Sequence, residues 1–100
     1  MQRLIEQPSD EGDLFIGSRR LGRVHYHLAV YQHFSDADES VPANLEIEGR
    51  LLPVQGLDLA ELHRHKSEVT LQLVDGRLLD LSVIDDGGRI HSTGRGLYSQ

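Results

Sequence analysis

Alternation of apolar and polar residues is the dominant pattern along this chain, and it is clearest over residues 22–34. The apolar-rich even positions are Gly22, Val24, Tyr26, Leu28, Val30, Gln32 and Phe34, and the polar-rich odd positions are Arg23, His25, His27, Ala29, Tyr31 and His33. A β-strand sends successive side chains to opposite faces, whereas a helix would mix the two sets around its circumference. The pattern therefore predicts one long strand whose even positions face the core.

Two further segments follow the strand pattern before the middle of the chain. Residues 45–54 alternate again: the positions predicted to face the core are Leu45, Ile47 and Leu51, and those predicted to face solvent are Glu46, Glu48 and Arg50. Pro53 cannot donate a hydrogen bond to a ladder, so it marks a strand end or an edge. Residues 14–16 predict a short strand that ends at Gly17. The acidic, serine- and proline-rich segments 6–13 and 35–44 are predicted to be loops.

The alternation breaks over residues 58–66, where the sequence predicts a helix of about two turns. Asp58 is followed three residues later by Glu61, the spacing of a helix N-terminal capping box with Asp in place of Ser or Thr. Leu59, Leu62 and His63 would then share one face of the helix. The alternative is a turn-rich connection with the same hydrogen bonds.

The C-terminal third predicts a meander of short strands. A two-residue turn at Asp75-Gly76 would pair Leu71 with Asp80 and mix core and solvent positions on each face. A type I turn with a glycine bulge instead pairs Leu71 with Leu79, which collects the apolar residues on one face and requires positive φ at Gly76. We therefore expect the bulged register. A second turn over 85–88 leads into a strand over 89–93, and residues 94–100 are predicted to be a frayed tail.

These elements predict an all-β fold with one short helix. Five or six strands joined by short turns, with one apolar face, must curl into a barrel or pack against something. We expect a small antiparallel β-barrel or a strongly curled meander sheet. The alternative is a single sheet whose apolar face or edge is covered by a second subunit. One domain is expected over residues 1–100, with flexible ends at 1–12 and 94–100.

Composition excludes several classes of protein. The 100 residues include no cysteine, which excludes a disulfide scaffold, an iron–sulfur cluster, a thiolate zinc site and a cysteine nucleophile. The net charge of −6 argues against non-specific binding to nucleic acid, which rests on neutralising phosphates. The longest apolar run, 28–31, is far shorter than a membrane span, and no apolar run follows Arg3 as in a signal peptide. We therefore expect a cytoplasmic protein with no membrane partner.

Histidine is the unusual residue, with six in the chain. His25 and His27 would lie about 6–7 Å apart on one face of the long strand, close enough to converge on one metal ion. His33 or a carboxylate from a neighbouring strand would complete such a site without cysteine. No cofactor is expected under the main interpretation, in which these histidines lie on a solvated face. Zinc or a similar divalent metal at His25 and His27 is the alternative.

Three arginines lie close together where the chain enters the long strand, and arginine binds carboxylate or phosphate in bidentate fashion. The spacing Arg19-x-x-x-Arg23 resembles one motif of the PilZ-type cyclic di-GMP receptors, which are also small β-barrels. The second PilZ motif, Asp or Asn, any residue, Ser, two more residues and Gly, begins here at Asp80-Leu81-Ser82, but Asp85 stands where the glycine belongs. The resemblance covers five residues in the first motif and two in the second, so we do not assign the chain to that family. In the competing interpretation the arginines pair with the acids of 10–13.

The functional hypothesis is a binding or interaction module that acts through the polar face of the long strand. Its candidate ligand-binding residues are Arg19, Arg20, Arg23, His25, His27, Tyr31 and His33. Cations, rings and hydrogen-bond donors in one row suit a small anion, a nucleotide-like molecule or a protein partner. Two other classes stay open: a histidine-based metal-binding protein or metalloenzyme, and a structural subunit that forms a homodimer through a sheet edge. No catalytic residue is assigned, because no Gly-x-Ser-x-Gly elbow or phosphate loop is present, and we expect a binding protein rather than an enzyme.

Overall fold

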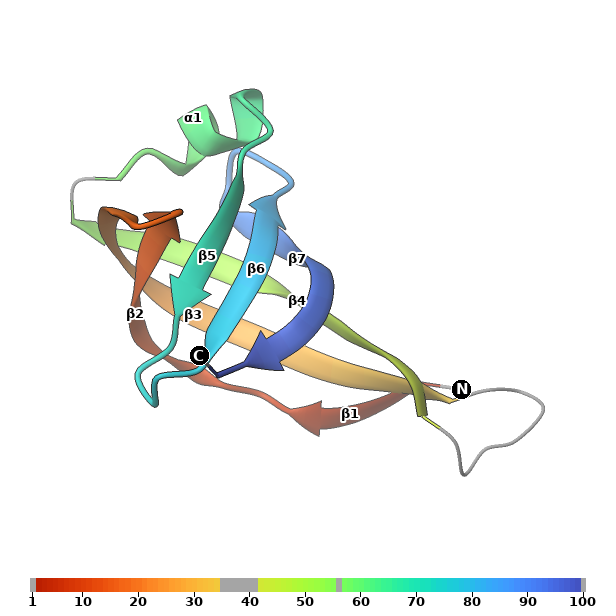
Figure 1. Cartoon of the computed structure of the whole chain (residues 1–100). Helices are drawn as coiled ribbons and strands as arrows, with labels where there is room; N and C mark the ends of the chain where they lie inside the picture. The colour runs from red at the N-terminus through yellow and green to blue at the C-terminus, as the bar shows by residue number, and fades with distance from the viewer. Residues whose placement is uncertain (1, 35–41, 56, 100) are drawn as a thin grey trace.

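Strands make up most of the chain (Figure 1). The computed structural model describes residues 2–34, 42–55 and 57–99. Its elements are β1 (Gln2–Glu6), β2 (Ser9–Ile16), β3 (Arg19–Phe34), β4 (Pro42–Gln55), α1 (Leu59–Arg64), β5 (Glu68–Gln72), β6 (Leu78–Val83) and β7 (Arg89–Tyr98). The prediction of a mainly β protein with one short helix is confirmed.

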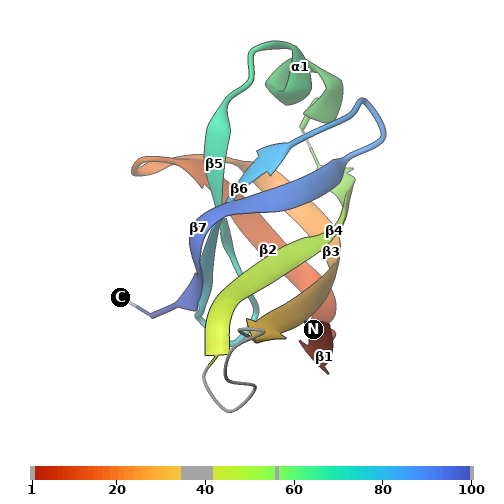
Figure 2. The same cartoon turned by 90° about the vertical axis from the view of Figure 1, so that its right-hand side faces the viewer.

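The strands close into a barrel. The order across the sheet is β1-β3-β2-β5-β6-β7-β4, and β4 pairs in turn with β3, so β2 to β7 form a closed antiparallel ring of six strands. β1 lies outside the ring, on the same edge of β3 as β2 (Figures 1 and 2). The barrel predicted from the alternation is therefore confirmed, and closure replaces the alternative of a single open sheet.

The interior of the barrel is filled by the residues that the alternation assigns to it. On β3, Val24, Tyr26, Leu28 and Val30 are buried, and the intervening positions are half-buried or exposed. The remaining strands add most of the rest of one apolar core, namely Leu14, Ile47, Leu51, Val69, Leu71, Leu79, Leu81, Val83 and Ile90. Leu73, directly after β5, and Leu59 of α1 complete it. The same alternation places polar side chains of β3 and β4 on the outer face, beside the exposed Leu52 and Val54, and that face carries the site described below.

The hairpin and helix predictions are confirmed in detail. Leu71 pairs with Leu79, as the bulged register requires, and Gly76 has a φ of 92°. The Asp58 side chain caps α1 by accepting a hydrogen bond from the backbone N–H of Glu61 at 3.2 Å. The helix lies over one end of the barrel (Figure 1).

Several predicted boundaries are wrong. Residues 9–13, predicted to be loop, belong to β2, because β3 offers a pairing partner that a loop-like composition does not reveal. The predicted tail continues β7 to Tyr98, which pairs with Leu78 across an irregular register. β4 begins at Pro42 and continues past Pro53 to Gln55, so 42–44 is strand and Pro53 does not end the element; residues 35–41 of that predicted loop lie outside the described residues. The expected flexible ends carry strand residues in β1, β2 and β7, and their flexibility stays a prediction.

A bidentate ion pair fastens the β5–β6 turn to β1. The Arg77 guanidinium donates to both carboxylate oxygens of Glu6, at 2.9 and 2.7 Å, and to Asp75 at 2.8 Å. The hydrogen bond from Arg77 lowers the pKa of the Glu6 carboxyl below its ordinary value of 4.5. A carboxylate with a lowered folded-state pKa adds stability above its unfolded-state pKa, and that stability is lost as the pH falls through the folded-state value.

The Glu6→Gln variant should therefore be less stable than the parent protein by about 1 kcal/mol at pH 7. The difference should shrink below pH 4.5 and vanish once the folded-state Glu6 carboxyl is protonated. Denaturant unfolding at a series of pH values measures it. Glu68→Gln is the matched control, because Glu68 is exposed and has no ion pair among the described residues. A difference that is equally large at pH 3 and pH 7 would contradict the ion-pair account.

Candidate functional site

The arginines at the start of β3 are largely paired with acids of β2. Arg20 donates to the Asp13 carboxylate at 3.0 Å, and the Arg23 guanidinium lies 3.5 Å from Glu11. Arg19 is exposed. The competing interpretation of the sequence, in which these arginines neutralise the acids of 10–13, therefore holds for Arg20 and Arg23. This leaves the cluster with less unpaired positive charge than the sequence suggests.

Asp80, which begins the second PilZ-like motif, has a structural role in the barrel. The Asp80 carboxylate accepts hydrogen bonds from the Thr70 hydroxyl at 2.9 Å and from the Tyr98 hydroxyl at 2.8 Å. These bonds connect β5, β6 and β7. In the barrel, β2 and β5 lie between the arginines of β3 and Asp80 of β6. The two motif fragments therefore lie on strands that are not neighbours and do not form one site.

The histidine pair of β3 is close together on the outer face. The ring centroids of His25 and His27 are 4.7 Å apart, and His27 Nδ1 shares a hydrogen bond of 2.8 Å with the Ser9 hydroxyl. Within the described part of the chain, no three His, Asp or Glu side chains are grouped as metal ligands. The His33 side chain lies outside the described residues, and Tyr31 is half-buried opposite Leu4 of β1. Metal binding by His25 and His27 stays a prediction.

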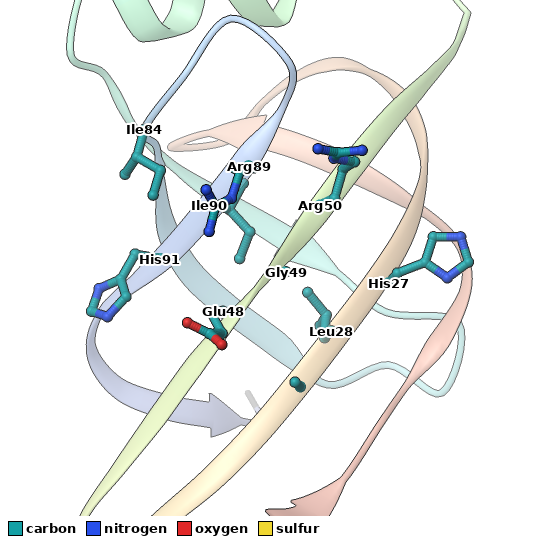
Figure 3. Close-up of a pocket in the computed structure, with 10 residues that line it drawn as sticks. His27, Leu28, Glu48, Gly49, Arg50, Ile84, Arg89, Ile90 and His91 are labelled. Atoms are coloured by element: carbon teal, nitrogen blue, oxygen red, sulfur yellow. The ribbon is translucent and has the colours of Figure 1, made fainter.

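A groove of about 490 Å³ lies beside His27, on the outer face of β3, β4 and β7 (Figure 3). Strand register arranges its lining as three rows that cross the three strands in turn. The rows are His27–Arg50–Arg89, Leu28–Gly49–Ile90 and Ala29–Glu48–His91, and Ile84 completes the wall. The middle row belongs to the barrel interior, so the first and third rows present their side chains outward.

The close approach of β4 to β3 in the central row is possible because Gly49 has no side chain. Residues 48–50 of β4 pair with β3 on one side and with β7 on the other. The β4 backbone therefore lies close to both neighbouring strands at this point. A Cβ on Gly49 would lie 2.1 Å from the backbone oxygen of His27 and 3.0 Å from the Leu28 Cα. Only glycine permits this approach of two backbones. Gly49 thereby fixes which residues face each other across the groove.

The first row places two arginines directly opposite each other. Arg50 and Arg89 are cross-strand partners, both are exposed, and neither guanidinium has an ion pair or hydrogen bond to any described residue. The nearby Asp85 carboxylate accepts hydrogen bonds from the backbone N–H groups of Arg89 and Gly87, and these bonds, with a smaller contribution from the positive charges of Arg89 and Arg50, lower the pKa of Asp85. The Asp85 carboxylate therefore chiefly stabilises the β6–β7 turn. The arginine pair is therefore a concentration of positive charge on an acidic protein.

The third row places a carboxylate and an imidazole two residues away. Glu48 is the cross-strand partner of His91, is exposed, and has no ion pair or hydrogen bond to a described residue. His91 Nε2 lies 3.2 Å from an Oε1 of Glu46. The groove therefore has a cationic end at Arg50 and Arg89. Its other end carries the Glu48 carboxylate, with His91 on the neighbouring strand.

Sequence reasoning found His27 but missed the arginines of this groove. The sequence pattern predicts Arg50 only as a solvent-facing position and Arg89 only as part of a strand. The missing information is the β4–β7 pairing, in which three pairs of residues 39 to 43 positions apart face each other. One available signal was Gly49 at a core-facing position of an otherwise regular strand, since such a glycine often marks a close approach of backbones.

Comparisons with known proteins place no further constraint on this site. No helix among the described residues is long and apolar enough to cross a membrane. Searches against protein-family models, curated proteins and solved structures find no match to the chain.

Proposed function

We propose that this protein is a small binding module that holds an anionic ligand in the groove between β3, β4 and β7. The observation that supports the proposal is the opposed pair Arg50 and Arg89, whose guanidinium groups form no ion pair or hydrogen bond with a described residue and have only the longer-range attraction of Asp85. Like charges directly opposite each other on a sheet are destabilising, and departures of this kind are typical of functional sites. The proposal keeps the anion-binding class expected from the sequence and moves its centre from the β2–β3 hairpin to the groove.

The chemistry of guanidinium suits phosphate or carboxylate. Each guanidinium offers a planar fork of donors that matches two oxygens of such an anion. An anion bound between Arg50 and Arg89 would also remove the repulsion between them. Because both side chains are exposed, water screens the interaction, and we expect a dissociation constant of roughly 1 mM for inorganic phosphate at low salt. Binding should weaken as the ionic strength rises.

Calorimetric titration with inorganic phosphate tests the proposal. The Arg50→Gln/Arg89→Gln variant should lose binding by about tenfold or more, because each lost charge-assisted hydrogen bond contributes about 1.5 kcal/mol. The matched control is Arg19→Gln/Arg20→Gln, which removes the same charge from the β2–β3 hairpin and should bind as the parent protein does. The groove variant should stay folded, because both arginine side chains are exposed.

Two outcomes would contradict the proposal. Binding that is lost in the hairpin variant and kept in the groove variant would place the anion at Arg19 and Arg20. Absence of phosphate binding to the parent protein at low salt would remove the anion-binding class altogether. Metal binding at His25 and His27 and self-association through a sheet edge remain alternative predictions.

A further inference from the structure

We infer that the ligand of the groove is a phosphomonoester whose other end carries hydrogen-bond donors, either the hydroxyls of a sugar or the ammonium of an amino alcohol. This inference rests on the proposed anion binding and deepens it. It comes from the Glu48–His91 row, which the anion itself does not use. The two outward-facing rows together describe a ligand with two chemically different ends.

The spacing of the rows sets the distance between those ends. Arg50 and Glu48 are two residues apart on β4, and Arg89 and His91 are two residues apart on β7. Side chains two residues apart on a strand lie on the same face at a separation of about 6–7 Å. A phosphate held at the arginine row therefore leaves its ester group lying across Gly49, toward the Glu48–His91 row. A short phosphomonoester spans this distance, whereas inorganic phosphate does not.

The Glu48–His91 row accepts hydrogen bonds. An ionised carboxylate has acceptors only, and Glu48 has no described partner that would occupy them. His91 Nε2 lies 3.2 Å from the Glu46 carboxylate, which also only accepts when ionised, so Nε2 carries the proton and donates it there. The open acceptors of the Glu48 carboxylate require donors on the ligand.

The same row excludes other anions. A ligand with negative groups at both ends would bring one of them against Glu48, which disfavours dicarboxylates and bisphosphates of this length. A phosphate ester without donors would leave the Glu48 carboxylate beside an alkyl group and gain nothing there. Ala29 and Ile84 also line the groove, and their apolar side chains offer contact to the carbon skeleton of the ligand. A phosphorylated polyol or amino alcohol satisfies all of these features.

Calorimetric titration with three probes tests the inference. Methyl phosphate carries no donor beyond the phosphate, glucose 6-phosphate carries hydroxyls, and phosphoethanolamine carries an ammonium group. At least one of the last two should bind about tenfold more tightly than methyl phosphate, as expected for one added hydrogen bond to a charged acceptor. Glu48→Gln should remove most of that advantage while methyl phosphate binds at least as tightly as to the parent, because a repelling charge is gone. Glu68→Gln, an exposed carboxylate on β5, is the matched control and should change neither affinity.

The outcomes separate this inference from the proposed function. An advantage shown by glucose 6-phosphate alone identifies a polyol phosphate, and one shown by phosphoethanolamine alone identifies an amino-alcohol phosphate; both support the inference. Equal affinities for all three probes, unchanged by Glu48→Gln, would overturn the inference and leave phosphate binding at Arg50 and Arg89 intact. If none of the three probes binds, both the inference and the proposed function are wrong.

Discussion

Replacing Gly49 by alanine is expected to lower the free energy of unfolding by about 3 kcal/mol, at the upper end of the cost of overpacking. The added methyl group would lie 2.1 Å from the backbone oxygen of His27, a distance that no contact tolerates. A backbone carbonyl in a ladder cannot rotate away as a flexible side chain can, so β4 would have to separate from β3. The shift in the midpoint of urea or guanidinium unfolding measures the effect.

Gly17→Ala provides the comparison for Gly49→Ala. Gly17 has a φ of 60°, and a Cβ there would meet nothing within 4 Å. Its replacement should cost only about 1 kcal/mol, the strain of a left-handed alanine. Equal effects of the two substitutions, or a Gly49→Ala variant as stable as the parent, would show that β4 does not approach β3 so closely. The alignment of rows in the groove would then be wrong as well.

The second large effect is expected at Tyr26, the largest fully buried side chain among the residues that the structure describes. Tyr26 is 1% exposed, and its hydroxyl accepts a hydrogen bond from the backbone N–H of Val74 at 3.2 Å. Tyr26→Ala should lower the free energy of unfolding by about 3–5 kcal/mol, the usual cost of removing a buried aromatic ring, because the closed barrel cannot collapse into the space. Thermal or denaturant unfolding followed by circular dichroism measures the loss.

Tyr26→Phe separates packing from hydrogen bonding at the same position. This variant keeps the ring and removes only the hydroxyl, so it should cost about 1 kcal/mol. A Tyr26→Ala variant that loses less than 1 kcal/mol would mean that the even positions of β3 do not face the barrel interior. The assignment of the odd positions to the outer face, on which the groove depends, would fall with it.

The fold was predictable from sequence where local rules decide the outcome. The period of two along 22–34 fixed the inward and outward faces of β3, and the position of Gly76 fixed the register that pairs Leu71 with Leu79. Both depend on residues that are adjacent in the chain or joined by a short turn. Asp58 identified the start of α1 in the same local way.

The boundaries and the groove depend on contacts between distant segments. The acidic composition of 9–13 resembles a loop, and only pairing with β3 and β5 makes it a strand. The Arg50–Arg89 row arises because barrel closure brings β7 to β4, and no local pattern gives the register of that pairing. The pairing of Arg20 and Arg23 with acids of β2 is equally a result of register.

The most direct test of the central claim, anion binding in the groove, is an amide correlation NMR spectrum of the assigned protein during titration with glucose 6-phosphate. The account predicts that the amide resonances that shift together and saturate are those of 48–50 and 89–91, with smaller shifts at 27–29. Shifts confined to the hairpin around Arg19 and Arg20, or a spectrum that does not change at millimolar ligand, would contradict it.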